Sequence, residues 1–113
     1  METVRLRQRI EKVMLGLAAP TGRVGYPQVV VAVEMIIQDG CVTSTTRTLY
    51  ERVAAECDTK PARIERNVRE EIKAIWAYGN HARLDQMFYN RSKYPPGNKE
   101  FLYTLARHLQ QEL

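Results

Sequence analysis

The segment that runs from Leu49 to Ala77 constrains the fold of this 113-residue chain more than any other part of it. Its first part repeats apolar residues every four positions, at Leu49, Val53 and Cys57. Asp58-Thr59-Lys60 interrupts the pattern, and Pro61 then suits the first turn of a second helix, where its missing N–H costs nothing. The second part has an apolar stripe of its own, made of Ile64, Val68, Ile72 and Ile75. The segment therefore predicts a helix, a three-residue turn and a second helix from Pro61 to Ala77.

Helical spacing recurs at both ends of the chain. The first segment repeats apolar residues at Leu6, Ile10, Val13, Met14 and Leu17. The last segment can be capped by Asn98, and its core face is made of Phe101, Leu102, Leu105 and Leu109. A short helix around residues 83–88 is expected between Gly79-Asn80 and the turn at residues 94–97.

The segment at residues 27–39 is ambiguous. Its valines and isoleucines favour a strand, whereas its length and the position of Pro27 favour a helix. We favour a buried helix that ends at Gly40, because glycine readily adopts the left-handed conformation at a helix end. With this segment helical, the fold class is all-α: one six-helix domain spanning residues 1–113, in which the third and fourth helices form a helix-turn-helix.

Composition narrows the class of protein without deciding it. Seventeen Lys and Arg against thirteen Asp and Glu give a formal charge of +4, a mild excess that permits nucleic acid without proving it. The two cysteines, Cys41 and Cys57, suit reduced, small core residues, so we expect a cytoplasmic protein rather than a secreted one. No stretch approaches the roughly twenty consecutive apolar residues that span a bilayer, so no membrane association is expected.

The polar face of the predicted second helix carries the candidate base-reading residues. On a helical wheel Arg66 lies almost opposite the apolar stripe, with Glu65 and Arg69 beside it. Arginine can donate two hydrogen bonds to guanine, and glutamate can accept one from cytosine, so these three residues together suggest sequence recognition in double-stranded DNA. The candidate phosphate contacts lie around the turn and along the same helix: Thr59, Lys60, Arg63 and Lys73.

Two other interpretations of that face remain open. It can be a solvated surface with salt bridges between successive turns, on a helix-turn-helix protein interaction module that no longer binds DNA. Three glutamates on the helix, Glu65, Glu70 and Glu71, motivate this alternative. RNA binding through exposed aromatic residues is a more remote possibility.

Other residue patterns point to no catalytic, metal or cofactor site. His81 and His108 lie far apart without a second ligand at metal spacing, and the cysteines form no Cys-x-x-Cys pair. The chain has no glycine-rich phosphate loop and no serine with an evident base partner, so we expect no enzyme and no cofactor. Trp76, near the end of the predicted recognition helix, is expected in the core.

The run Arg63-Ile64-Glu65-Arg66-Asn67-Val68-Arg69, continued by Trp76, Gly79 and Asn80, resembles the C-terminal effector domain of the stage zero sporulation protein A family of endospore-forming bacteria. Further matching positions extend over nearly the whole chain: Pro20, Gly25-Tyr26, Leu49-Tyr50, Phe88, Asn98, Glu100, Phe101, Ala106 and Leu109. The resemblance implies a six-helix fold, makes residues 27–39 helical and implies a location in the bacterial nucleoid. It also implies that the fourth helix reads a TGTCGAA-like promoter box, with domains bound in tandem as a homodimer on DNA.

The resemblance implies further roles for regions outside the recognition helix. The short helix at residues 83–88 matches the surface through which the family contacts the RNA polymerase sigma factor, which makes Arg83, Gln86 and Phe88 candidates for that contact. Of these, only Phe88 matches by identity, and the loop at residues 89–97 is shorter than the family's usual connection. The family normally carries an N-terminal receiver domain, and we expect none in this chain, which is either an excised domain or a stand-alone relative.

Overall fold

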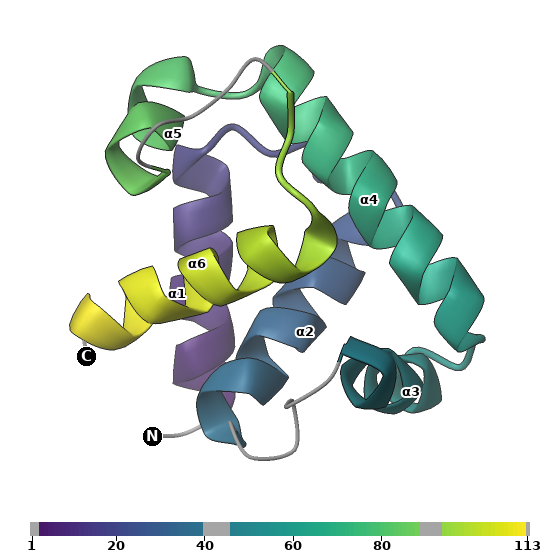
Figure 1. Cartoon of the computed structure of the whole chain (residues 1–113). Coiled ribbons are helices and arrows are strands. Elements are labelled where there is room, and N and C mark those ends of the chain that lie inside the picture. The colour runs from purple at the N-terminus through teal and green to yellow at the C-terminus, as the bar shows by residue number, and fades with distance from the viewer. Residues whose placement is uncertain (1–2, 40–45, 89–93, 113) are drawn as a thin grey trace.

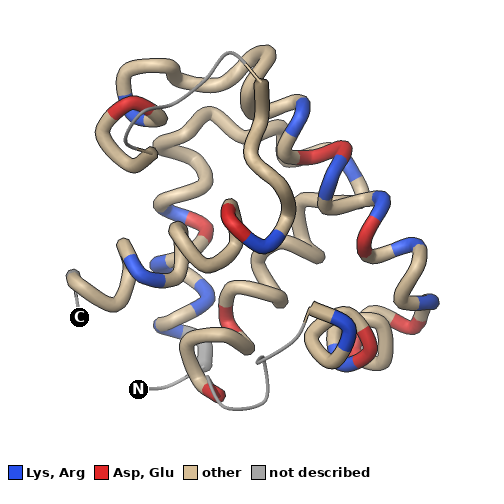
Figure 2. The backbone as a smooth tube through the Cα atoms, viewed as in Figure 1, with Lys and Arg blue, Asp and Glu red and all other residues tan. Residues whose placement is uncertain are grey.

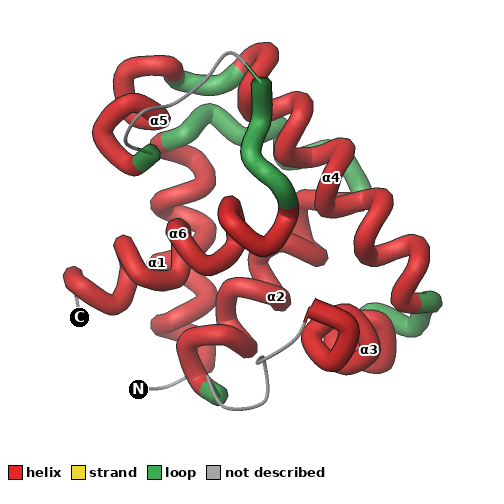
Figure 3. Tube along the Cα trace, in the orientation of Figure 1, coloured by secondary structure: helices red, strands yellow, loops and turns green. Residues whose placement is uncertain are grey.

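The computed structural model describes residues 3–39, 46–88 and 94–112 of the chain, and all regular secondary structure within them is helical (Figures 1 and 3). The helices are α1 (Thr3–Gly16), α2 (Gly25–Gln38), α3 (Thr46–Glu56), α4 (Pro61–Tyr78), α5 (His81–Met87) and α6 (Asn98–Glu112). The predicted all-α fold with six helices is therefore confirmed for this part of the chain.

Helix α2 lies at the centre of the fold, in contact with α1, α3, α4 and α6 (Figure 1). Residues 28–34 are all buried, so α2 is covered on every side, as expected of a helix that is apolar all round. Its burial overrides the strand propensity of its valines and isoleucines, which decides the ambiguous segment. The helix begins at Gly25, two residues before Pro27, and Gly40, its predicted end, lies outside the described residues.

Three aromatic side chains join the end of α4 to α5 and α6. The rings of Trp76 and Phe88 meet edge to face with centroids 5.1 Å apart, and those of Phe88 and Phe101 stack at 5.5 Å. Trp76 also packs edge to face on Phe101 at 6.2 Å. All three side chains are buried, so the predicted core position of Trp76 is confirmed. Edge-to-face and offset stacked rings stabilise such a cluster beyond their burial.

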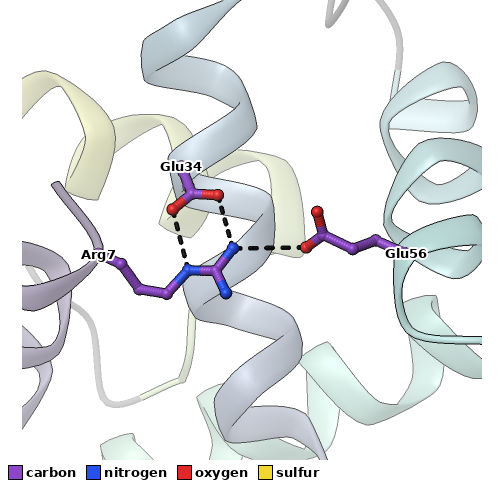
Figure 4. Close-up of polar contacts among 3 residues, drawn as sticks. All are labelled: Arg7, Glu34 and Glu56. Atoms are coloured by element: carbon purple, nitrogen blue, oxygen red, sulfur yellow. Dashed lines mark hydrogen bonds and ion pairs between the residues drawn. The ribbon is translucent and has the colours of Figure 1, made fainter. Parts of the chain in front are cut away.

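A charged cluster joins the first three helices (Figure 4). Arg7 on α1 donates to both carboxylate oxygens of Glu34 on α2, from Nε over 2.9 Å and from Nη2 over 2.7 Å. The same Nη2 lies 3.5 Å from Glu56 Oε2 at the end of α3. The hydrogen bonds to Glu34 are the main cause of a raised Arg7 pKa. The cluster thus connects the central helix to the end of α3, just before the turn that leads into α4.

Candidate nucleic-acid interface

The turn between α3 and α4 has the features of a helix-ending motif. Asp58 adopts a left-handed conformation with φ 55°, and the N–H of Thr59 donates to the carbonyl of Ala54 over 2.9 Å. Asparagine and aspartate tolerate this conformation better than most residues, which agrees with the predicted role of Asp58 in the bend. Cys57, predicted on the apolar face of α3, follows the last helical residue and is half-buried.

Helix α4 begins as predicted, with Pro61 at its first position. Lys60 precedes it in an extended conformation and, because its side chain has no acceptor, leaves the first N–H groups of the helix without a side-chain cap. The helix ends at Tyr78, one residue beyond the predicted Ala77. Figure 1 shows α3 nearly end-on while α4 runs across the view, so the two axes are steeply inclined, consistent with a helix-turn-helix.

The two faces of α4 separate as the helical wheel predicts. The stripe of Ile64, Val68, Ile72 and Ile75 is at most 1% exposed. Glu65, Arg66 and Arg69 are exposed on the outer side. Figure 2 shows basic and acidic positions interspersed along this helix. One helix therefore presents all three candidate base-reading side chains to solvent together, which is the geometry that a major-groove contact needs.

Ion pairs occupy part of this face. Arg69 Nη1 lies 3.1 Å from Glu65 Oε1 one turn earlier, and Lys73 Nζ lies 3.3 Å from Glu70 Oε2. Arg66 makes no ion pair with any residue that the structure describes. Exposed pairs of this kind contribute about 0.3–0.5 kcal/mol, so a hydrogen bond to a base edge can replace them at little cost.

The backbone of α4 is anchored at the level of Glu65. The side-chain amide of Asn98, at the start of α6, donates to the Glu65 carbonyl over 3.0 Å and to Tyr50 Oη over 3.1 Å. Asn98, predicted as a cap for its own helix, is the first residue of α6 and directs this amide to α3 and α4 instead. Tyr50 is buried, and its desolvation raises the pKa of the hydroxyl. This contact joins the exposed face of α4, at the level of Glu65, to α3 and α6.

The candidate phosphate contacts lie in the turn before α4 and along α4 itself. Lys60 and Arg63 are exposed at the start of α4, Thr59 is half-buried in the turn, and Lys73 is exposed three turns further along. A hollow beside α4 is lined by Glu65, Arg69, Ile72 and Lys73 from that helix, by Thr46 and Tyr50 from α3, and by residues 95–100. Lys99 is among the latter, and sequence reasoning missed it, because only the folding of α6 against α4 brings it to this face.

Glu71 departs from the other glutamates of α4 because it is fully buried. Neither carboxylate oxygen has a hydrogen-bond partner among the described residues, and the nearest cation is Arg23 Nε at 3.9 Å. Burial raises the Glu71 pKa to about 7, and the charge of Arg23 opposes the rise. Of the three glutamates that motivated a protein interaction module, only Glu65 and Glu70 face solvent.

The three residues predicted for polymerase contact divide between surface and core. Arg83 and Gln86 are exposed on α5, whereas Phe88 is 6% exposed and belongs to the aromatic cluster. The one position that matches by identity is therefore occupied by a packing residue. Figure 1 shows α5 well separated from α3 and from the start of α4.

The described residues hold no group of three or more potential metal-ligating side chains. No helix among them is long and apolar enough to cross a membrane. Burial raises the pKa of the Cys57 thiol, and Cys41 lies outside the described residues.

An all-helical domain with a steeply inclined helix pair and an exposed, arginine-bearing second helix fits the helix-turn-helix class of DNA-binding domains. Residues 10–109 match the family described as Sporulation initiation factor Spo0A C terminal. The chain belongs to this family, as its sequence resemblance predicts. Membership identifies it as a DNA-binding response regulator effector domain that acts in the regulation of transcription in sporulation, in a family of regulators rather than of enzymes.

Proposed function

We propose that this domain is a sequence-specific transcription regulator that inserts α4 into the major groove and reads a TGTCGAA-like box. The observation that carries the proposal is the exposure of Glu65, Arg66 and Arg69 together, opposite a fully buried stripe. A helix can enter the groove only when its reading side chains project from one side.

Each base-reading residue has its own role in this proposal. Arg66, which pairs with no described residue, donates two hydrogen bonds to O6 and N7 of a guanine. Glu65 accepts from N4 of a cytosine. Arg69 stays close to Glu65 and contacts either a second guanine or the adjacent phosphate. The proposed box contains both guanine and cytosine, so it offers partners of both kinds.

The phosphate contacts orient the helix in the groove. Lys60 and Arg63 lie at the positive end of the α4 dipole, where backbone N–H groups also favour an anion. Thr59 contacts the same strand from the turn, and Lys73 reaches the backbone further along the helix. These contacts supply affinity without sequence preference.

Two partners are proposed in addition to DNA. A second copy of the chain binds the neighbouring box in tandem. The RNA polymerase sigma factor contacts the surface of α5 through Arg83 and Gln86, with Phe88 supporting that helix from within the core.

A second candidate is a protein interaction module that has kept the fold and lost DNA binding. The ion pairs Glu65–Arg69 and Glu70–Lys73 favour it, because they neutralise part of the exposed face. A titration of box-containing and scrambled duplexes with the domain, at low and at moderate salt, separates the candidates. A regulator binds the box more tightly than the scrambled duplex, and its affinity falls as salt rises. An interaction module shows no salt-sensitive binding to either duplex.

A further inference from the structure

A cavity of about 420 Å³ lies between α1, α5 and α6, and none of the residues that line it belongs to α3 or α4. Its basic lining residues come from all three helices: Arg9 and Lys12 from α1, Arg83 from α5, and His108 from α6. Val13, Leu17 and Met87 give it an apolar floor. The cavity therefore combines converging basic groups with apolar surface, away from the candidate DNA interface.

The basic groups of α1 share one stripe of that helix. Arg9, Lys12, Val13 and Gly16 follow at steps of three, four and seven residues, which places them on one side. This side is not the one that α1 directs toward the core, since Arg9 and Lys12 are both exposed. The stripe thus forms one wall of the cavity along about two helical turns.

Helix α5 forms the opposite wall of the cavity and lies close to the end of α1. An added Cβ at Gly16 would lie 3.9 Å from both Nε and Nη2 of Arg83, so the guanidinium lies over this glycine. Asn80, just before α5, donates its N–H to the Leu17 carbonyl over 2.8 Å. An added Cβ at Gly79 would lie 2.7 Å from the same carbonyl oxygen, so the chain can pass this closely only with glycine at position 79. These contacts fix α5 against α1.

The charges of this cavity are not balanced within the described structure. No carboxylate of a described residue lines it. Arg9, Lys12 and Arg83 form no ion pair with any described residue. The carbonyl groups at the end of α1 carry partial negative charge and can attract Arg83. They do not offset the charges of Arg9 and Lys12, which lie earlier in the helix. Like charges held around a concave surface repel one another and attract anions, and a bound anion would relieve that repulsion.

We propose that this cavity binds a small phosphate monoester whose organic part is apolar or aromatic. A doubly charged phosphate matches the three cationic side chains Arg9, Lys12 and Arg83 better than a single carboxylate does, and guanidinium groups bind its oxygens through paired hydrogen bonds. The organic part contacts Val13, Leu17 and Met87. The cavity volume falls within the range of small-ligand sites. The site shares Arg83 and Gln86 with the proposed polymerase surface but does not depend on that proposal or on DNA binding.

The test is a titration of the ¹⁵N-labelled full chain with phenyl phosphate, followed by amide chemical shifts at physiological salt. The expected result is saturable shifts centred on Gly16, Arg83 and Gln86, with weaker binding of inorganic phosphate and none of phenol. Absence of saturable shifts, or shifts centred on α4, would overturn the proposal.

Variants decide whether the basic cluster causes the binding. The double variant Arg9→Ala with Arg83→Ala should lower the affinity for phenyl phosphate at least tenfold. Lys12→Glu changes a single exposed residue and should lower the affinity by a similar factor. The matched control combines Arg47→Ala with Arg52→Ala, which removes two exposed arginines from α3 and should leave the affinity unchanged. Equal weakening by the control would show a general charge effect and contradict the proposal.

Discussion

Gly25 lies close against Glu71, where the start of α2 meets α4. An added Cβ at Gly25 would lie 2.9 Å from the Cβ of Glu71 and would also meet the backbone carbonyl oxygen of Asn67. Backbone atoms cannot move aside as a flexible side chain can, so this position admits no side chain without a shift of the helices. The approach brings the start of α2 against the side of α4 that carries the buried carboxylate.

Gly25→Ala should therefore lower the free energy of unfolding by roughly 1–3 kcal/mol or more, because the added methyl group overpacks this contact. Urea denaturation followed by circular dichroism measures the change. Gly22→Ala is the matched control, since an added Cβ there meets nothing within 4 Å, and it should change stability by no more than about 0.5 kcal/mol. Similar effects of both substitutions would contradict the close approach.

Glu71 should make stability depend on pH. Its pKa is about 7 in the folded state, above the value of 4.5 expected when exposed. Between these values the folded state holds a proton that the unfolded state has released, so stability falls as pH rises, by roughly 3 kcal/mol in total. Glu71→Gln should remove this fall and be the more stable form above pH 8. Unfolding of the parent domain and of Glu71→Gln at several pH values tests this prediction. The control is Glu70→Gln, at an exposed neighbour, whose stability should still fall as pH rises.

Arg7→Ala should destabilise the domain by roughly 1–3 kcal/mol, because it leaves the buried Glu34 carboxylate without its two donors. The loss stays within this range because the Arg7 side chain is 40% exposed and water partly screens the pair. A double-mutant cycle with Glu34→Gln measures the coupling, which should be well above zero. The control is Arg5→Ala, at an exposed position on the same helix, which should change stability little. Additive effects in the cycle would rule out the interaction between Arg7 and Glu34.

Lys60→Ala should weaken binding to box and scrambled duplexes by a similar factor, because Lys60 is proposed to contact phosphate. The slope of log affinity against log salt should decrease in magnitude by about 1. Lys12→Ala removes the same charge from α1 and should leave the slope unchanged. A loss confined to the box would instead assign Lys60 to base reading.

The sequence predicts those helices whose regularly spaced apolar residues are the ones that the fold buries. The stripe from Ile64 to Ile75 identifies α4 and its exposed face, and Pro61 identifies its start. The sequence does not decide the structure of α2, because its valine-rich composition suits a strand. Packing against the surrounding helices makes this segment helical. Glu71 could have been assigned to the core, since it follows Val68 by three residues and Ile64 by seven.

The remaining features depend on contacts between residues distant in sequence. No local pattern indicates that Asn98 bonds to the backbone of Glu65, or that Lys99 lines the hollow beside α4. The burial of Phe88 likewise follows from Trp76 and Phe101, which belong to other helices. These details required the packed structure.

Base reading by Arg66 is tested by comparing Arg66→Ala with the parent domain on box and scrambled duplexes by fluorescence anisotropy. Arg66→Ala should lose roughly 1–3 kcal/mol of binding free energy on the box and much less on the scrambled duplex, so that specificity declines. Arg107→Ala, an exposed arginine on α6, should leave both affinities unchanged. An equal loss on both duplexes with Arg66→Ala would contradict base reading by this helix.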